Sequence, residues 1–236
     1  MTNKDYINAY KSEDKILTDY YKYRDTNGNL VNLEGIINPL KIDNRQIVSP
    51  VDNQKDSPHC AGFSAATMVE TLYWKQTGKL LQIDSHQVYA LAKQLDGDVD
   101  SEGTFLEHSL SAALTLAQDK EGFEFLKDAK IGLFYNHQDL ATIESIKYFL
   151  KKYEILQVGF NIDDGWYNCD NENYVLQKGN RNLGGHAVNI CGYDSRGFYV
   201  MNQWSTSFGA KGFAIIPYDL LLQQLMYGAY IYNITY

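Results

Sequence analysis

A polar loop runs into an apolar segment at Val51–Asp52–Asn53–Gln54–Lys55–Asp56–Ser57–Pro58–His59–Cys60–Ala61–Gly62–Phe63–Ser64–Ala65–Ala66. The Ser57–Pro58 pair disfavours a helix before it, because proline restricts the preceding residue to extended conformations. From Cys60 onward the residues are small or apolar, and apolar residues recur at helical spacing. The sequence therefore predicts a buried helix over 60–76, stopped by Gly78, with Cys60 in its first turn.

The position of Cys60 favours a reactive thiolate. Backbone N–H groups in a first helical turn lack partners and the helix dipole is positive there, so both stabilise a negatively charged sulfur. The plainer interpretation is a structural residue, since free cysteine is among the most buried residue types. Cys191 fits that interpretation within a predicted strand, and Cys169 lies in a polar loop where we expect it to be exposed. The three cysteines lack metal-type spacing, and their odd number leaves at least one thiol free.

Composition excludes several classes of partner. The chain has 236 residues, a formal net charge of -8 and 44% hydrophobic residues, which suits one domain of two lobes with a sizeable core. An acidic chain lacks the basic face that nucleic acids and anionic membranes attract, so we expect neither as a partner. No apolar run approaches the ~20 residues that span a bilayer, and residues 1–6 lack a secretory signal's apolar stretch. We expect a monomer that is cytoplasmic, trimmed of its leader, or exported by a non-classical route.

The first half of the chain is predicted to be mainly helical and the second half mainly stranded. Apolar residues share one helical face over 85–95, 104–117 and 139–152, and Asp84 can cap the first of these helices. The expected strands are 155–162, 186–193, 197–201, 212–216 and 227–235, with a polar loop over 163–182. This order favours an α+β fold with an N-terminal extension over 1–38, a helical lobe over about 50–150 and a β lobe over about 153–236.

Two further segments carry groups that could work with Cys60. Gly184–Gly185–His186 places a histidine at the start of a strand, and Met201–Asn202–Gln203–Trp204 places an amide before a large aromatic residue. Alone, the first is typical of a structural histidine and the second of an ordinary turn. Together they supply an imidazole that can take the proton of Cys60 and an amide that can orient the imidazole. The backbone N–H of Cys60 and the side-chain amide of Gln54 could then bind an oxyanion.

These segments together resemble the papain-like cysteine peptidases. The resemblance covers the chain from about residue 38 to the C-terminus, and Gln54, Cys60, His186 and Asn202 follow one another in the family's order and spacing. The stretch 85–116 is similar to bacterial members, and 60–63 to staphopain-like relatives. The segments that carry the likeness are 44–54, Gly184–Gly185–His186–Ala187–Val188, Gly192–Tyr193–Asp194, Asn202–Gln203–Trp204, Phe208–Gly209 and Gly212–Phe213.

The resemblance implies a papain-like two-lobed domain over 39–236, with the active site between a helical lobe and an antiparallel β lobe. It implies hydrolysis of peptide or protein substrates through a Cys60–His186 thiolate–imidazolium pair oriented by Asn202, without a metal or an organic cofactor. The oxyanion hole would be Gln54 and the Cys60 N–H. The implied substrate-binding residues are Gly103 for the substrate backbone, Trp204 as a shield of the His186–Asn202 bond, and Gly184, Gly185 and Ala187 with 158–160 as pocket walls.

Departures from the family pattern leave alternatives open. Ser57, Pro58 and Ala61 stand where the family has cysteine, glycine and tryptophan, and Gln203 and Ser205 replace serine and glycine beside the key tryptophan. One alternative is a related acyl transferase or a highly selective effector protease, which transfer of an acyl group to an added amine would distinguish. The other is a catalytically silent binding protein, which an unreactive Cys60 would favour. The presence of all four polar site residues favours the peptidase.

Overall fold

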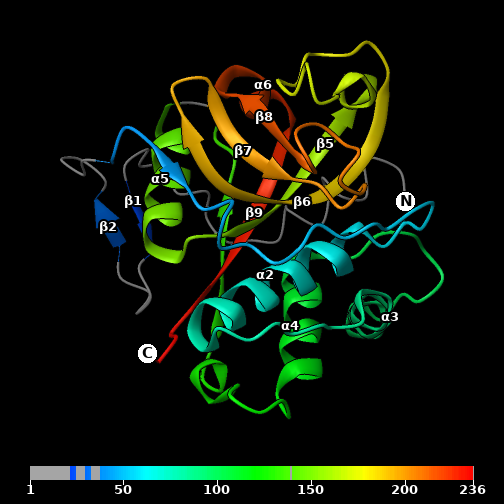
Figure 1. The fold of residues 1–236 in the computed structure, drawn as a ribbon, viewed down its shortest axis with the longest axis vertical. Helices are drawn as coiled ribbons and strands as arrows, with labels where there is room; N and C mark the ends of the chain where they lie inside the picture. The colour runs from blue at the N-terminus through cyan, green and yellow to red at the C-terminus, as the bar shows by residue number, and fades with distance from the viewer. Residues whose placement is uncertain (1–21, 25–29, 33–37, 139, 236) are drawn as a thin grey trace.

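The structure, a computed structural model, describes residues 22–24, 30–32, 38–138 and 140–235 (Figure 1). Most of the extension predicted over 1–38 lies outside the described residues. Within it, strand β1 (Lys22–Arg24) pairs antiparallel with β2 (Leu30–Asn32). The rest of the described chain forms a layer of helices against an antiparallel sheet, which confirms the predicted α+β class.

Three helices form the layer that includes Cys60. They are α2 (Cys60–Thr77), α3 (Ser85–Asp96) and α4 (Leu106–Ala117), close to their predicted bounds. Gly78 ends α2 in the left-handed conformation, with φ of 67°. The Asp84 side chain caps α3 by accepting the N–H groups of His86 and Gln87, as the sequence predicts. A Cβ at Gly62 would lie 2.4 Å from the Ser85 carbonyl oxygen, so this glycine permits the close approach of α2 and α3.

The sheet has seven strands in the order β4-β9-β5-β6-β7-β8, with the short β3 (Ile42–Asp43) also paired to β6. The other strands are β4 (Lys130–Tyr135), β5 (Leu156–Asp163), β6 (Asn182–Asp194), β7 (Gly197–Met201), β8 (Phe213–Pro217) and β9 (Leu225–Tyr232). Five of them lie at predicted positions, and β6 begins four residues before the predicted start. The central pair is in register with Phe160 opposite His186 and Gln157 opposite Asn189.

The helical lobe expected to reach about residue 150 ends earlier. Strand β4 is the edge strand beside β9, and α5 (Leu140–Tyr153) contacts β5, β6 and β9. The apolar face of α5 is present at its predicted positions, but a periodic pattern does not say which layer buries it. Strand β4 and helix α6 (Tyr218–Gln224) were not predicted. The short turns η1 (Glu124–Leu126) and η2 (Asp164–Asn168) complete the described elements.

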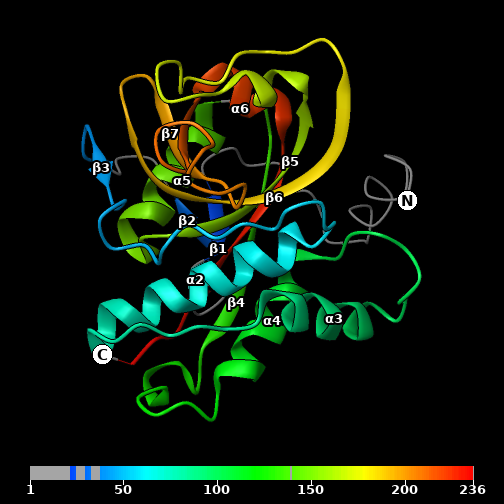
Figure 2. The ribbon, with the colours of Figure 1, turned by 45° about the vertical axis from the view of Figure 1, so that its right-hand side comes forward.

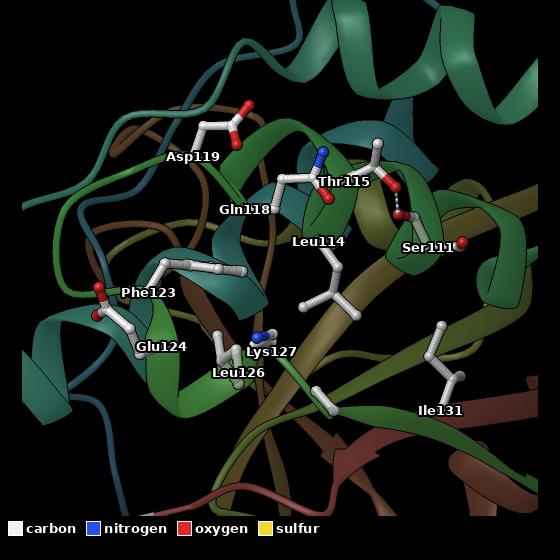
Figure 3. Close-up of a pocket in the computed structure, with 11 residues that line it drawn as sticks. Ser111, Leu114, Thr115, Gln118, Asp119, Phe123, Glu124, Leu126, Lys127 and Ile131 are labelled. Carbon is white, nitrogen blue, oxygen red and sulfur yellow. Dashed lines mark hydrogen bonds between the residues drawn. The ribbon is translucent and has the colours of Figure 1, made fainter.

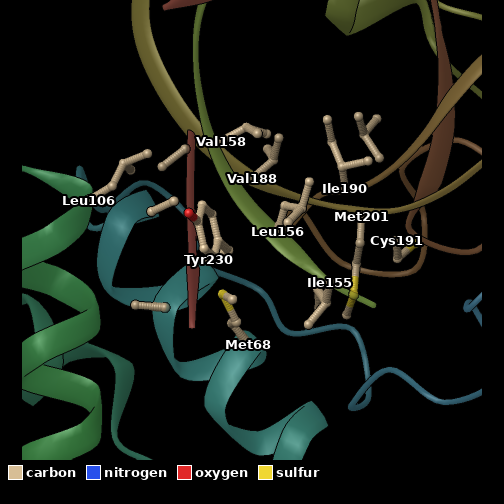
Figure 4. Close-up of a cluster of buried hydrophobic side chains, with 14 of the residues drawn as sticks. Met68, Leu106, Ile155, Leu156, Val158, Val188, Ile190, Cys191, Met201 and Tyr230 are labelled. Carbon is tan, nitrogen blue, oxygen red and sulfur yellow. The ribbon is translucent and has the colours of Figure 1, made fainter. Parts of the chain in front are cut away.

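One buried core joins the helices to the sheet. Figure 4 shows Met68 from α2 and Leu106 from α4 facing Leu156, Val158, Val188 and Ile190 of the central strands. Helix α2 lies along the sheet and contacts both β5 and β6 (Figure 2). This packing brings the N-terminal turn of α2 to the strand that carries His186. None of the helices within the described ranges has the length and apolar character that a membrane span requires.

Candidate active site

Cys60 is the first residue of α2 and is partly buried. Burial raises the pKa of its thiol, while hydrogen bonding to the backbone of Ala187, Ala61 and Cys60 lowers it. The N–H groups of the helix N-terminus therefore act in the predicted direction, but the burial of the thiol outweighs them. The contact with Ala187 places the sulfur beside β6, next to the residue that follows His186.

His186 and Asn202 form a buried hydrogen-bonded pair. The distance from His186 Nε2 to Asn202 Oδ1 is 2.9 Å, and both side chains are buried. Because the amide oxygen can only accept, Nε2 carries the proton and Nδ1 is the ring nitrogen that remains to take a second proton. Burial lowers the pKa of His186 to about 4, and the Asn202 hydrogen bond opposes that shift.

Aromatic rings enclose this pair. The Trp204 ring centroid lies 4.9 Å from that of His186, and Trp166 meets His186 edge-on at 5.9 Å. Tyr167 stacks on Trp204 at 5.5 Å and is largely exposed. Trp204 thus lies where a shield of the His186–Asn202 bond is expected, and the shielding itself stays a prediction. Trp166 and Tyr167 were missed, although two adjacent aromatic residues in a polar loop were a signal of a packed turn.

Gln54 is docked against the loop that carries Asn202. Its backbone N–H donates to the Gln203 carbonyl at 2.8 Å, and Asn53 forms a β-bridge with Trp204. The buried Gln54 side chain donates from Nε2 to the Ser57 carbonyl at 2.9 Å. One N–H of the amide is therefore used within the loop, and the second is not used by any residue in the described ranges. That second N–H is the donor available for the predicted oxyanion hole.

Both backbone groups of Gly103 are engaged by side chains of α3. Its N–H donates to the Tyr89 hydroxyl at 2.9 Å, and its carbonyl accepts from Lys93 Nζ at 2.9 Å. Lys93 is itself buried and pairs with Asp96 at 3.3 Å. The predicted substrate-backbone role of Gly103 stays a prediction, and in this structure its single N–H donor is occupied. Tyr89 and Lys93 were not predicted, because only the folded chain brings α3 against this segment.

His59, which precedes the nucleophile candidate, is directed at α3. Its ring stacks on Tyr89 at 4.0 Å, and its Nδ1 lies 2.7 Å from Nδ1 of His86. Burial lowers the pKa of His59, and the neighbouring His86 lowers it further. These contacts give His59 a local packing role against α3.

The other two cysteines are both buried. Cys191 lies in the core of β6, as predicted, and burial raises the pKa of its thiol. Cys169 is buried at 9% exposure, so the expectation of an exposed loop thiol was wrong. Burial, followed by the charge of Asp170, raises the pKa of Cys169 to about 11. Cys169 packs against Gly209, whose N–H donates to the Cys169 carbonyl at 3.3 Å. Cys60 is the one cysteine of the three that is partly exposed as a residue.

Two pockets lie outside the Cys60–His186–Asn202 set. A pocket of about 460 Å³ lies between α4 and η1, lined by residues such as Leu114, Phe123 and Lys127 (Figure 3). A pocket of about 630 Å³ lies beside the loop that precedes α2 and includes His86 in its wall. No group of three or more histidine, cysteine or acidic side chains among the described residues could hold a metal ion.

Comparisons with known proteins identify the fold. No protein-family model matches the chain, and no curated protein matches it in sequence. Xylellain, a cysteine protease from Xylella fastidiosa, is similar with a TM-score of 0.62 and 16% identity, over 84% of this chain and 88% of that one. The Carica candamarcensis cysteine protease CMS1MS2, in complex with E-64, has a TM-score of 0.60 and 20% identity, over 84% and 100%. The chain has the papain-like fold.

The bromelain protease from Ananas comosus in complex with the E64 inhibitor is similar too, with a TM-score of 0.59 and 19% identity over 82% of this chain and 98% of that one. Within this papain-like fold, the β5–β6 register sets Gly159 opposite Ala187 and Ile162 opposite Gly184. Gly184 has φ of 102°, and open space surrounds its Cβ position. The predicted walls 158–160 and 184–187, with Gly185, are therefore neighbours beside His186, and their role in binding substrate stays a prediction.

Proposed function

We propose that this protein is a cysteine peptidase whose nucleophile is Cys60. The observation that carries the proposal is the buried His186–Asn202 hydrogen bond of 2.9 Å, next to a cysteine at a helix N-terminus. An asparagine oxygen that fixes the imidazole tautomer leaves Nδ1 free to receive a thiol proton. The fold supports the proposal because solved cysteine proteases share it.

The proposed reaction has two halves. The Cys60 proton passes to His186 Nδ1, the sulfur attacks the peptide carbonyl carbon, and the resulting oxyanion is held by the Cys60 N–H and Gln54. His186 then gives its proton to the leaving amine as the C–N bond breaks, which leaves a thioester on Cys60. Water, deprotonated by His186, attacks that thioester, and the acid product leaves as the proton returns to the sulfur.

Burial decides how the proton moves. It raises the pKa of Cys60 and lowers that of His186, so each charge is penalised when it forms alone. Two opposite charges formed together in contact stabilise each other in the same surroundings. We therefore propose that thiolate and imidazolium appear as a pair, shielded by Trp204, and that neither persists without the other.

The experiment is the pH dependence of Cys60 alkylation by iodoacetamide, followed by mass spectrometry. Labelling of Cys60 well below pH 7 that is lost in His186→Ala is the expected result, with the buried Cys169 and Cys191 as internal controls. Labelling only near the ordinary thiol pKa of ~8.5, unchanged in His186→Ala, would contradict the pair and favour the silent binding protein.

The type of reaction is tested with a mixed peptide library, with Cys60→Ala as the control. Hydrolysis that disappears in Cys60→Ala supports the peptidase. Transfer of the acyl group to an added amine faster than hydrolysis would instead identify the acyl transferase. Cleavage that persists in Cys60→Ala would remove Cys60 from the mechanism.

A further inference from the structure

Four polar side chains without solvent exposure lie between α2 and the sheet: Ser64, Gln157, Asn189 and Gln203. We call them the amide cluster. None of them has a role in the proposed reaction, and none is accessible to a substrate. Polar groups so deeply buried are costly unless they are paired, so their hydrogen bonds indicate what they hold in place.

Side chains from two strands form hydrogen bonds with the first turns of α2. Gln157 on β5 and Asn189 on β6 are direct cross-strand partners. Gln157 Nε2 lies 3.0 Å from the Ala61 carbonyl and 2.7 Å from Ser64 Oγ. Asn189 Nδ2 donates to the Ser64 carbonyl at 3.0 Å. The helix that begins with Cys60 is thus tied to the sheet by directional bonds within its first five residues.

The cluster also reaches the loop of the orienting asparagine. Gln203 Nε2 donates to Asn189 Oδ1 at 2.9 Å, and the Gln203 carbonyl accepts the N–H of Gln54. Gln203 follows Asn202 in the chain, and Asn189 lies three residues beyond His186 on the same strand. Each member of the proposed catalytic set therefore has a near neighbour in the cluster.

Apolar packing alone would not fix the position of α2 relative to the sheet, which we call its register. The hydrophobic effect is not directional, so a helix on an apolar sheet can shift or rotate at small cost. Reacting groups, in contrast, must be held to a fraction of an ångström, and a displacement of about 1 Å can cost about 100-fold in rate. Hydrogen bonds from two strands and one loop supply the direction that apolar contacts lack.

We propose that the amide cluster holds Cys60 in register with His186 and Asn202, and that Asn189 and Gln203 are positioning residues. The inference rests on the proposed function, because it needs that catalytic set. Asn189 is the central member, since it accepts from the loop of Asn202 and donates to the helix of Cys60. Gln203 is the residue that replaces the family's serine, so the link is a property of this chain.

The test compares Gln203→Met, Asn189→Leu and the double variant. The variant Gln203→Met leaves Asn189 Oδ1 buried without its donor, which lowers the melting temperature. The double variant removes both polar partners, so its melting temperature recovers toward that of the unmodified protein. We expect Cys60 alkylation at pH 6 to fall by at least about tenfold in all three variants, because the register is lost in each.

The control is Cys191→Ala on the same strand. Cys191 is fully buried, contacts the Tyr199 carbonyl and lies outside the cluster. This variant should lower the melting temperature yet keep the pH profile of Cys60. An equal loss in the control, or an unchanged profile in the double variant, overturns the inference.

The two proposals fail in different ways. If the unmodified protein has no acid limb of alkylation that depends on His186, the proposed function is wrong and the inference falls with it. If that acid limb is present and the double variant keeps it, only the inference is wrong. Where a peptide substrate is found, a positioning role also predicts a lower kcat with little change in KM.

Discussion

At the scale of single residues, the chemistry of the site depends on how burial treats charge. His186 lies between Trp204 and Trp166, and this enclosure lowers the pKa of its imidazole to about 4. A neutral imidazole is a base ready to take a proton, but only a nearby negative charge can keep that proton on it. Cys60 is the group that would supply the charge.

Replacing Cys60 by alanine should therefore change the titration of His186. In Cys60→Ala no thiolate can form, and we expect His186 to titrate at about 4, because burial favours the neutral ring. In the unmodified protein the pairing with the thiolate should raise that pKa. NMR titration of the imidazole resonances measures both values. The same pKa in both proteins would contradict the proposed pair.

Glu70 on α2 provides a separate test of how burial shifts the pKa of a side chain in this protein. Burial raises the pKa of its carboxyl to about 7, and its Oε1 accepts the Ile83 N–H at 2.8 Å. The stability that protonated Glu70 contributes is fully present below pH 4.5 and is lost as the pH rises through 7. Between these two values the folded protein still binds a proton that the unfolded chain has released.

Glu70→Gln keeps an acceptor for Ile83 and removes this titration. We expect the variant to be more stable than the unmodified protein at pH 8, by on the order of 2 kcal/mol, and similar at pH 4. Thermal melts at both pH values check this, with Glu70→Ala as the control that loses the acceptor. A variant of equal stability at both pH values would show that the carboxyl is not buried in solution.

At the scale of elements, side chains of α3 form hydrogen bonds with the backbone of the segment that precedes α4. Tyr89 and Lys93 take both backbone groups of Gly103, while Tyr89 also stacks on His59. The N–H of Gly103 would have to leave Tyr89 before it could bind a substrate backbone. If Gly103 has its predicted role, helix α3 competes with a substrate for the same donor.

Tyr89→Phe should relieve that competition. The ring and its stacking on His59 remain, but the acceptor of the Gly103 N–H is gone. We expect KM for a peptide substrate to fall about fivefold with little change in kcat, since a net hydrogen bond is worth about 1 kcal/mol. Steady-state kinetics with matched substrates measures this. A higher KM would contradict the predicted role of Gly103 and would indicate that the Tyr89 hydroxyl itself contacts the substrate.

At the scale of the whole molecule, the helices and the sheet share one core. Helix α2 contacts β5 and β6, and its buried residues belong to the same cluster as those of the central strands. A shared core gives the two layers no separate route to unfold. The candidate site has Cys60 on the helical layer and His186 on the sheet, so we expect it to depend on that joint stability.

We therefore expect a single unfolding transition in urea. In Trp74→Phe, which alters a partly exposed residue of α2, tryptophan fluorescence reports on Trp166 and Trp204 of the sheet side. The fluorescence midpoint should coincide with the circular dichroism midpoint at 222 nm, which is dominated by helices. Separate midpoints would show that the two layers unfold independently.

The sequence by itself determined most of the local elements and the candidate catalytic groups. Small and apolar residues at helical spacing predicted α2, Asp84 predicted the start of α3, and strongly apolar runs predicted β5 to β7. Strand β4 and helix α6 were missed, because β4 has several partly exposed residues and is stabilised by pairing with the remote β9. The order and spacing of Gln54, Cys60, His186 and Asn202 predicted a catalytic set, and its catalytic role stays a prediction.

Only the tertiary structure decided the surroundings of those groups. The burial that lowers the pKa of His186, the occupation of the Gly103 N–H by Tyr89, and the link from Gln203 through Asn189 to Ser64 join residues far apart in the chain. Hydrogen bonds and desolvation act over a few ångströms, so they depend on which segments meet in space. A residue's type and spacing set what chemistry it can do, and its packed neighbours set the energy at which it does so.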